Sequence, residues 1–154
     1  MRGAYRVLAS LLALEVIIQA AAVVYGVFGL ANYVDDGHTI TAQDFEENSD
    51  LSFSGLGGLI LHGMNGMMII PLIALLLLIV SFFAKVPGGS KWAGFVLLDV
   101  VVQIALAFVS FGAPIVGILH GVNALFLAWL GWAAAHRVST VETAERAHDE
   151  PALI

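Results

Sequence analysis

Four stretches of the chain are almost entirely apolar, and each is at least 20 residues long. They cover residues 7–30, 55–83, 92–111 and 114–135. A helix needs about 20 apolar residues to cross the hydrocarbon core of a bilayer, and the absence of water there obliges the main chain to be helical. The sequence therefore predicts an all-α polytopic membrane protein, with a four-helix transmembrane bundle over residues 1–137 and a cytoplasmic tail at 138–154. Pro71 is expected to kink the second helix, and Pro114 to lie in the first turn of the fourth.

Composition agrees with this prediction and excludes several classes of protein. The chain has a mean hydropathy of +0.94, and only 12% of its residues are charged, which lies outside the range of soluble domains. It contains no cysteine, so disulfides, thiolate metal sites, iron–sulfur clusters and covalently attached c-type haem are excluded. No basic stripe is present, so nucleic acid is not an expected partner.

The basic residues predict which end of each helix faces the cytoplasm. The loop at 32–54 contains six Asp or Glu residues and no Lys or Arg. All six Lys and Arg residues fall on the opposite side of the predicted bundle, and they are Arg2, Arg6, Lys85, Lys91, Arg137 and Arg146. The positive-inside rule then predicts a multi-pass protein of the plasma (inner) membrane, with both termini in the cytoplasm and the acidic loop outside.

Two short phrases inside the apolar stretches are each written twice. The sequence LHGMNG at 61–66 recurs at 119–124 as LHGVNA, and LEVIIQ at 14–19 recurs at 98–103 as LDVVVQ. Polar side chains are costly inside a membrane and mark functional positions there. The order of the phrases predicts two tandem helical hairpins, related by a pseudo-two-fold axis along the membrane normal.

The spacing within these phrases predicts that their polar side chains meet at the axis of the bundle. In each phrase the two polar residues are three or four positions apart, so they share one face of a helix. The pairs are Glu15 with Gln19, His62 with Asn65, Asp99 with Gln103, and His120 with Asn123. The rise per residue puts the histidines and glutamines about level, roughly 9–11 Å from the outer boundary, and the acids and asparagines one turn deeper.

Two histidines at equal depth on parallel helices predict bis-imidazole ligation of one haem b by His62 and His120. A ligating imidazole needs a partner for its other N–H, and a backbone carbonyl one turn back, or Gln19 and Gln103, could supply it. Small residues beside the histidines leave room for a flat macrocycle, and Phe28, Phe108, Phe111 and Ile118 could form its apolar walls. The expected cofactor-binding set is His62, His120, Gln19, Gln103, Asn65, Asn123, Gly66 and Gly117.

This arrangement resembles membrane haem-b proteins of the cytochrome b561 kind and the half-bundle of haem A synthase, in which paired histidines hold haem between helices. It is also similar to small four-span actinobacterial membrane proteins. The resemblance covers all four stretches and depends mainly on His62 and His120. It implies electron transfer near the outer face of the membrane, with a quinone or the subunits of a larger respiratory complex as partner. A catalysed reaction does not follow from these residues.

Other interpretations stay open from the sequence. The polar residues could join helices in a cofactor-free structural or accessory subunit. Copper could bind His62 together with the neighbouring methionines Met64, Met67 and Met68, and the histidines and carboxylates together could bind another transition metal. Glu15 and Asp99 could instead carry protons or hold a transported ion. The acids of the outer loop could bind a cation or dock a partner, although a solvated loop also explains them.

Overall fold

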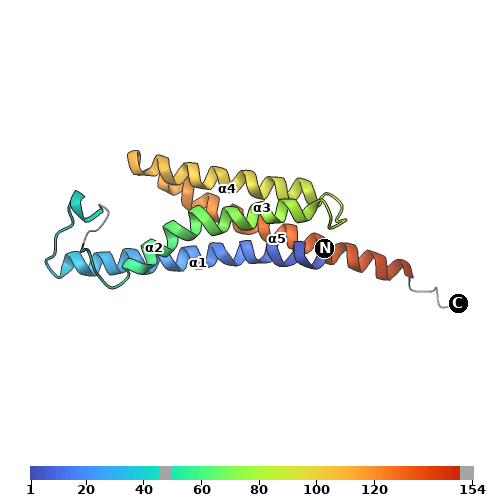
Figure 1. The fold of residues 1–154 in the computed structure, drawn as a ribbon, viewed down its shortest axis with the longest axis horizontal. Helices are drawn as coiled ribbons and strands as arrows, with labels where there is room; N and C mark the ends of the chain where they lie inside the picture. The colour runs from blue at the N-terminus through green and yellow to red at the C-terminus, as the bar shows by residue number, and fades with distance from the viewer. Residues whose placement is uncertain (46–49, 150–154) are drawn as a thin grey trace. The chain divides into compact units, whose positions relative to one another are not determined.

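The computed structural model describes residues 1–45 and 50–149, and its regular secondary structure in those ranges is entirely helical (Figure 1). The elements in chain order are α1 (Arg2–Asp35), the 3-10 helix η1 (Ala42–Phe45), α2 (Leu56–Met64), the π-helical turn η2 (Asn65–Ile69), α3 (Ile70–Ser81), α4 (Gly89–Gly112) and α5 (Val116–Asp149). The predicted all-α class is therefore confirmed. Glu46, Glu47 and the last five residues of the predicted tail lie outside the described residues.

Four helical segments are long and apolar enough to cross a membrane. They are Arg2–Asp35, Leu56–Ser81, Gly89–Gly112 and Val116–Thr140, and each overlaps one of the predicted stretches. The first and last helices extend beyond their predicted limits. No Gly or Pro occurs between Trp132 and Asp149, so nothing in the sequence breaks α5, which continues directly into the predicted tail.

The contacts divide the chain into two compact units, and each is described by itself. Unit 1 comprises Met1–Ile17 and Met67–Ile154, and unit 2 comprises Ile18–Gly66. Unit 1 thus contains the first half of α1 together with α3, α4 and α5. Unit 2 contains the second half of α1, the loop with η1, α2 and the beginning of η2.

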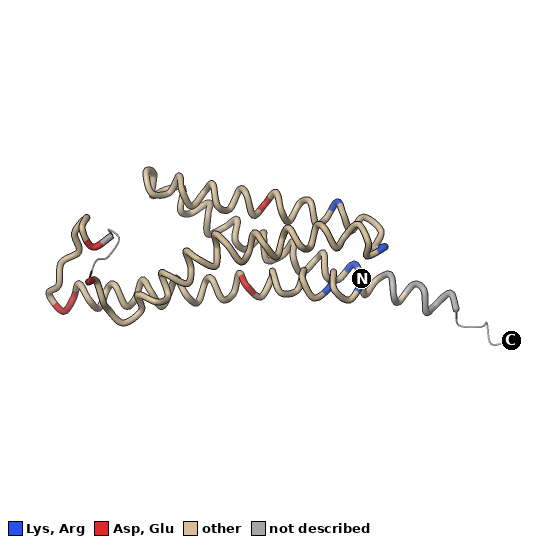
Figure 2. Tube along the Cα trace, in the orientation of Figure 1, with Lys and Arg blue, Asp and Glu red and all other residues tan. Residues whose placement is uncertain are grey.

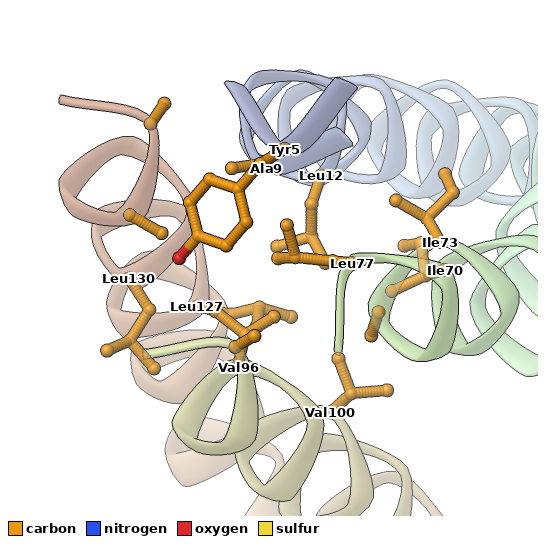
Figure 3. Packing of buried hydrophobic residues seen from close by; sticks show 14 of the residues in the cluster. Tyr5, Ala9, Leu12, Ile70, Ile73, Leu77, Val96, Val100, Leu127 and Leu130 are labelled. Carbon is orange, nitrogen blue, oxygen red and sulfur yellow. The ribbon is translucent and has the colours of Figure 1, made fainter. Parts of the chain in front are cut away.

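The core of unit 1 is formed by side chains from all four of its helical segments. Figure 3 shows Leu12 of α1, Leu77 of α3, Val96 of α4 and Leu127 of α5 pointing toward one another, and all four are almost completely buried. Tyr5 packs at the same core, and its hydroxyl donates a hydrogen bond to the carbonyl oxygen of Gly89 at 3.1 Å. This bond ties the start of α1 to the start of α4.

One end of unit 1 carries its basic residues. Figure 2 shows the Lys and Arg positions of this unit gathered near the start of α1 and the turn between α3 and α4. The guanidinium carbon of Arg137 lies 4.6 Å from the centre of the Trp92 ring, and the Lys91 ammonium lies 5.7 Å from that of Phe95. The cations are thus held against aromatic faces, where the ring quadrupole attracts them.

Unit 2 packs the second half of α1 directly against α2 through glycines. A Cβ atom at Gly58 would collide with the carbonyl oxygen of Ala22, and one at Gly29 would collide with that of Ser54. Gly55 precedes α2 with a φ of 106°, a left-handed conformation that favours glycine. Small residues therefore let the two main chains touch, as they do where membrane helices pack closely.

Pro71 and Pro114 differ in their positions relative to the helices. The π-helical turn η2 begins at Asn65 and ends just before the first turn of α3, where Pro71 lies, and the kink expected at Pro71 stays a prediction. A wider turn accommodates a proline that lacks an N–H and crowds the preceding turn. The prediction for Pro114 is wrong. It lies in a tight turn before α5, and its carbonyl accepts the N–H of Gly117 at 2.9 Å.

Candidate functional site

The clearest polar cluster of unit 1 centres on His120, between α4 and α5. Its Nδ1 lies 3.0 Å from the main-chain oxygen of Gln103. A carbonyl oxygen can only accept, so Nδ1 carries the proton and Nε2 carries the lone pair. The Gln103 side-chain amide agrees with this tautomer, because its nitrogen lies 3.3 Å from His120 Nε2 and can donate to it. Gln103 thus contacts both ring nitrogens of the imidazole, Nδ1 through its main-chain oxygen and Nε2 through its side-chain amide.

The same glutamine continues the network deeper between the two helices. Its amide nitrogen donates to the carbonyl oxygen of His120 at 3.0 Å, and its Oε1 accepts from Asn123 Nδ2 at 2.8 Å. Asn123 in turn hydrogen-bonds the carboxyl group of Asp99. Four predicted site residues of the second repeat therefore form one connected chain, which runs from His120 through Gln103 and Asn123 to Asp99.

Asp99 ends this chain with one oxygen unpaired. Its side chain is only 7% exposed, and within the described part of the protein its Oδ2 has no hydrogen-bond partner. A buried carboxyl oxygen without a partner costs free energy, and native proteins usually keep such an atom for a reason. Within this cluster, Asp99 therefore has the buried oxygen that a bound proton or ligand would stabilise.

Unit 2 contains the corresponding contact in the first repeat. His62 Nδ1 lies 3.1 Å from the main-chain oxygen of Gln19, so its proton is also directed at the glutamine carbonyl of the preceding helix. A Cβ atom at Gly66 would lie 3.1 Å from Gln19 Nε2, so the glycine leaves room for this side chain. The Oε1 atom of Gln19 is buried and has no hydrogen-bond partner among the described residues. The main-chain contact is thus repeated, whereas the bond that the side-chain oxygen of Gln103 accepts has no counterpart at Gln19 among the described residues.

These contacts refine the expected role of the glutamines. The sequence left two acceptors open for the histidine N–H: a carbonyl one turn back on its own helix, or the glutamine. The structure places both histidines on the glutamine, through its main-chain oxygen. Levels within each helix pair agree with the helix rise, since each histidine lies beside its glutamine and Asp99 lies beside Asn123.

Two further predicted polar residues belong to different units. Glu15 is half-buried on α1 in unit 1, and Asn65 is buried at the start of η2 in unit 2. A Cβ atom at Gly117 would make only ordinary contact with Ser110, at 3.8 Å. Among the described residues, no group of three or more His, Asp or Glu side chains is placed to hold a metal ion. Met64, Met67 and Met68, which the copper interpretation needs, are each at least half exposed.

The glycines next to the histidines serve two different purposes. Gly63 and Gly121 each follow a histidine directly, and a Cβ atom at either position would meet nothing within 4 Å. Gly58 instead contacts the main chain of α1 and leaves no room for a ligand, so it is a packing residue. The aromatic side chains expected as walls for a macrocycle lie at the surface, and Phe111 is 88% exposed.

A groove between α4 and α5 was missed by sequence reasoning. It has a volume of about 340 Å³ and is lined by Trp92, Phe95, Leu98, Asp99, Val102, Phe126, Trp129 and Leu130. The spacing of Trp92, Phe95 and Asp99 along one face of α4 is the signal that could have revealed it.

The outer loop uses one of its acids locally. Asp44 Oδ2 accepts hydrogen bonds from the main-chain N–H of Thr41 at 2.6 Å and from its hydroxyl at 2.9 Å. These bonds, that from the N–H first, hold the pKa of Asp44 below its usual value of 3.8. Nearby, the rings of Tyr33 and His38 stack with centroids 4.3 Å apart. Asp44 therefore stabilises the start of η1.

Comparison of the chain with protein-family models, with curated proteins and with solved structures finds no match. The function must therefore be argued from the residues themselves.

Proposed function

We propose that this chain is a membrane haem-b protein in which His62 and His120 are the axial ligands of one haem. It takes part in electron transfer near the outer face of the membrane, with a quinone or the subunits of a larger respiratory complex as partner. The observation that carries the proposal is the repeated contact of each histidine Nδ1 with a glutamine carbonyl, at 3.1 Å for His62 and 3.0 Å for His120.

This contact is the one that metal-ligating histidines characteristically make. The second ring nitrogen donates to a carbonyl, which sets the tautomer, fixes the ring orientation and raises the basicity of the ligating nitrogen. Nε2 is then the nitrogen that would bind iron in both repeats. Iron binding at His120 Nε2 requires the Gln103 side-chain amide to turn away from that nitrogen. At 3.3 Å this bond is the longest, and so the weakest, of the three that the Gln103 side chain makes.

Both repeats have a glycine directly after the histidine. Gly63 and Gly121 occupy equivalent places in the two repeats, and a Cβ atom at either position would meet nothing within 4 Å. The repeated local geometry supports two tandem hairpins related by a pseudo-two-fold axis. One haem shared by two equivalent histidines is the simplest use of that symmetry.

Three observations support insertion in the membrane. Four helices have the necessary length and apolar composition, and many large apolar side chains on them are exposed, including Ile17, Phe82 and Leu125, each more than 60% exposed. The basic end of unit 1 fits the cytoplasmic side by the positive-inside rule. Both termini are then cytoplasmic and the acidic loop is outside.

An absorption spectrum tests the proposal directly. Protein purified after expression with adequate haem supply and reduced with dithionite should show sharp haem-b bands. His62→Ala and His120→Ala should each abolish the low-spin spectrum. His136→Ala is the matched control, because His136 is exposed and its ring bonds its own helix, through Nδ1 and the Trp132 carbonyl oxygen at 3.1 Å. A colourless wild-type protein, or an unchanged spectrum in both ligand variants, would overturn the assignment.

A second candidate is a cofactor-free accessory subunit in which the polar residues join helices. The network of Gln103, Asn123 and His120 favours it, because these three side chains already satisfy one another. The same spectrum separates the two candidates. Neither candidate gives the unpaired oxygen of Asp99 a partner.

A further inference from the structure

The groove between α4 and α5 combines aromatic walls with one ionisable group. Among the eight described residues that line it, Asp99 is the only Asp, Glu, Lys, Arg or His. Its Oδ2 atom is buried and unpaired, as shown above. The volume of about 340 Å³ is at the lower end of the range for small-molecule sites, which suits a single ring system.

The aromatic side chains of the groove contact one another. The rings of Phe126 and Trp129 are stacked, with centroids 5.5 Å apart and planes 20° apart. Trp92 lies 5.8 Å from Trp129 and closes the groove toward the basic end of unit 1, where Arg137 covers its face. Rings placed in this way offer flat faces to a flat ligand.

The groove opens on the apolar outer surface of these helices. Phe95, Leu98 and Trp129 line it and are 44%, 61% and 48% exposed. A ligand must therefore be soluble in lipid and must carry a polar atom that can share a hydrogen bond with a carboxyl group. An acyl chain would leave Oδ2 unpaired, and an anionic headgroup would be repelled by an ionised Asp99.

We propose that this groove binds the ring of a membrane quinone or quinol, with the Asp99 carboxyl group hydrogen-bonded to one ring oxygen and the isoprenoid tail left in the lipid. A quinol hydroxyl can donate to the ionised carboxylate, and a quinone carbonyl can accept from the protonated carboxyl. The proposal names the redox partner of the haem protein, and its role in electron transfer rests on the proposed function, whereas binding to the groove does not.

The position of Asp99 also connects the groove to a proposed haem ligand. The hydrogen-bonded chain through Asn123 and Gln103 reaches His120 without leaving the α4–α5 interface. A ring bound at Asp99 therefore touches the same polar network that holds the imidazole. No other lining residue of the groove belongs to that network.

Photolabelling tests the site. The probe is an azido-benzoquinone with a short isoprenoid chain, and unlabelled decyl-benzoquinone is the competitor. In the wild-type protein we expect saturable labelling of the peptides that line the groove, suppressed by the competitor. Asp99→Leu should weaken competition by about tenfold, the effect of one lost buried hydrogen bond. Asp99→Asn should retain binding, because an amide can still donate to a ring oxygen.

A second pair of variants guards against misfolding at Asp99. Trp129→Leu removes part of the aromatic lining of the groove and should reduce labelling. Trp132→Leu lies three positions further along α5, outside the groove, and should not change it. Labelling spread evenly over the apolar surface would show that only lipid occupies the groove and would overturn the proposal. Labelling undiminished in both Asp99→Leu and Trp129→Leu would also overturn it, because neither residue would then bind the probe.

The haem spectrum of the same preparation keeps the two proposals separate. A colourless protein that is labelled in the groove would overturn the proposed function and leave the quinone site standing. A haem protein with diffuse labelling would overturn the quinone site alone.

Discussion

The same substitution at the two glutamines should have opposite effects on stability. Gln19 and Gln103 occupy equivalent places in the repeat, and both give a main-chain oxygen to a histidine. Their side chains differ, because that of Gln103 is bonded and Gln19 has a buried, unpaired Oε1. Replacing each with leucine, which is as good a helix former, therefore isolates the side-chain contacts.

The expected loss at Gln103 follows from its three side-chain contacts. These are the bonds to the His120 carbonyl at 3.0 Å, to His120 Nε2 at 3.3 Å and from Asn123 at 2.8 Å. Interhelical hydrogen bonds in membrane proteins contribute about 0.6 kcal/mol each on average. Gln103→Leu should therefore lower the free energy of unfolding by about 2 kcal/mol.

Gln19→Leu should cost nothing and should stabilise the protein by up to about 1 kcal/mol. Burying an amide oxygen without a partner is unfavourable by about 1–3 kcal/mol, and leucine removes that group at similar volume. The main-chain bond from His62 is unaffected by the change. The prediction applies to protein without added haem, in which Gln19 has the surroundings described above.

Reversible unfolding in mixed micelles with increasing SDS, followed by far-ultraviolet circular dichroism, measures both changes. A double-mutant cycle of Gln103→Leu with Asn123→Leu should show a coupling energy, since the two side chains share a bond of 2.8 Å. Equal destabilisation by the two glutamine variants, or a larger loss at Gln19, would refute the reasoning.

Two further predictions concern unit 2. Gly58→Ala should destabilise the contact of α2 with α1, because its Cβ atom would collide with the Ala22 carbonyl. Gly63→Ala meets no atom and should be neutral or stabilising by about 0.5–1 kcal/mol, the difference in helix propensity between glycine and alanine. The same SDS titration measures both variants, and equal losses of stability would contradict the packing. The lowered pKa of Asp44 means that its bonds to Thr41 persist as the pH falls below 3.8 and are lost only as the pH passes through the lower folded-state pKa. The Thr41 amide resonance in an NMR titration should report that midpoint, it should not titrate in Asp44→Asn, and a midpoint at or above 3.8 would count against the hydrogen bonds.

Much of the candidate site follows from spacing alone. Residues four apart on a helix share a face, which put Asp99 with Gln103, and the helix rise put Asn123 and His120 at their levels. The hydrogen bonds among these four side chains agree with that reasoning. The sequence could not choose between the main-chain and side-chain atoms of the glutamine, because both lie within reach of an imidazole on a neighbouring helix.

Other features depended on distances that spacing does not contain. Gly58 and Gly63 look alike in the sequence, yet only Gly58 touches another helix. The repeat also made Gln19 and Gln103 appear equivalent, whereas the side-chain oxygen of Gln103 accepts a hydrogen bond and that of Gln19 has no partner among the described residues. The groove beside Asp99 required the rotation of α4 relative to α5, which brings Trp92 and Trp129 to the same side.

The sequence by itself determined the helical class, the number of helices and the pairing of polar residues on their faces. These follow from the cost of apolar and polar groups in their surroundings and from the period of the helix, and both are properties of a single chain segment. The tertiary structure alone decided which glycine is packed, which glutamine is satisfied and where Asp99 meets an open groove. Those outcomes depend on how two helices are rotated and how closely they approach. A shift of about one ångström between atoms on neighbouring helices decides whether a hydrogen bond or a collision results.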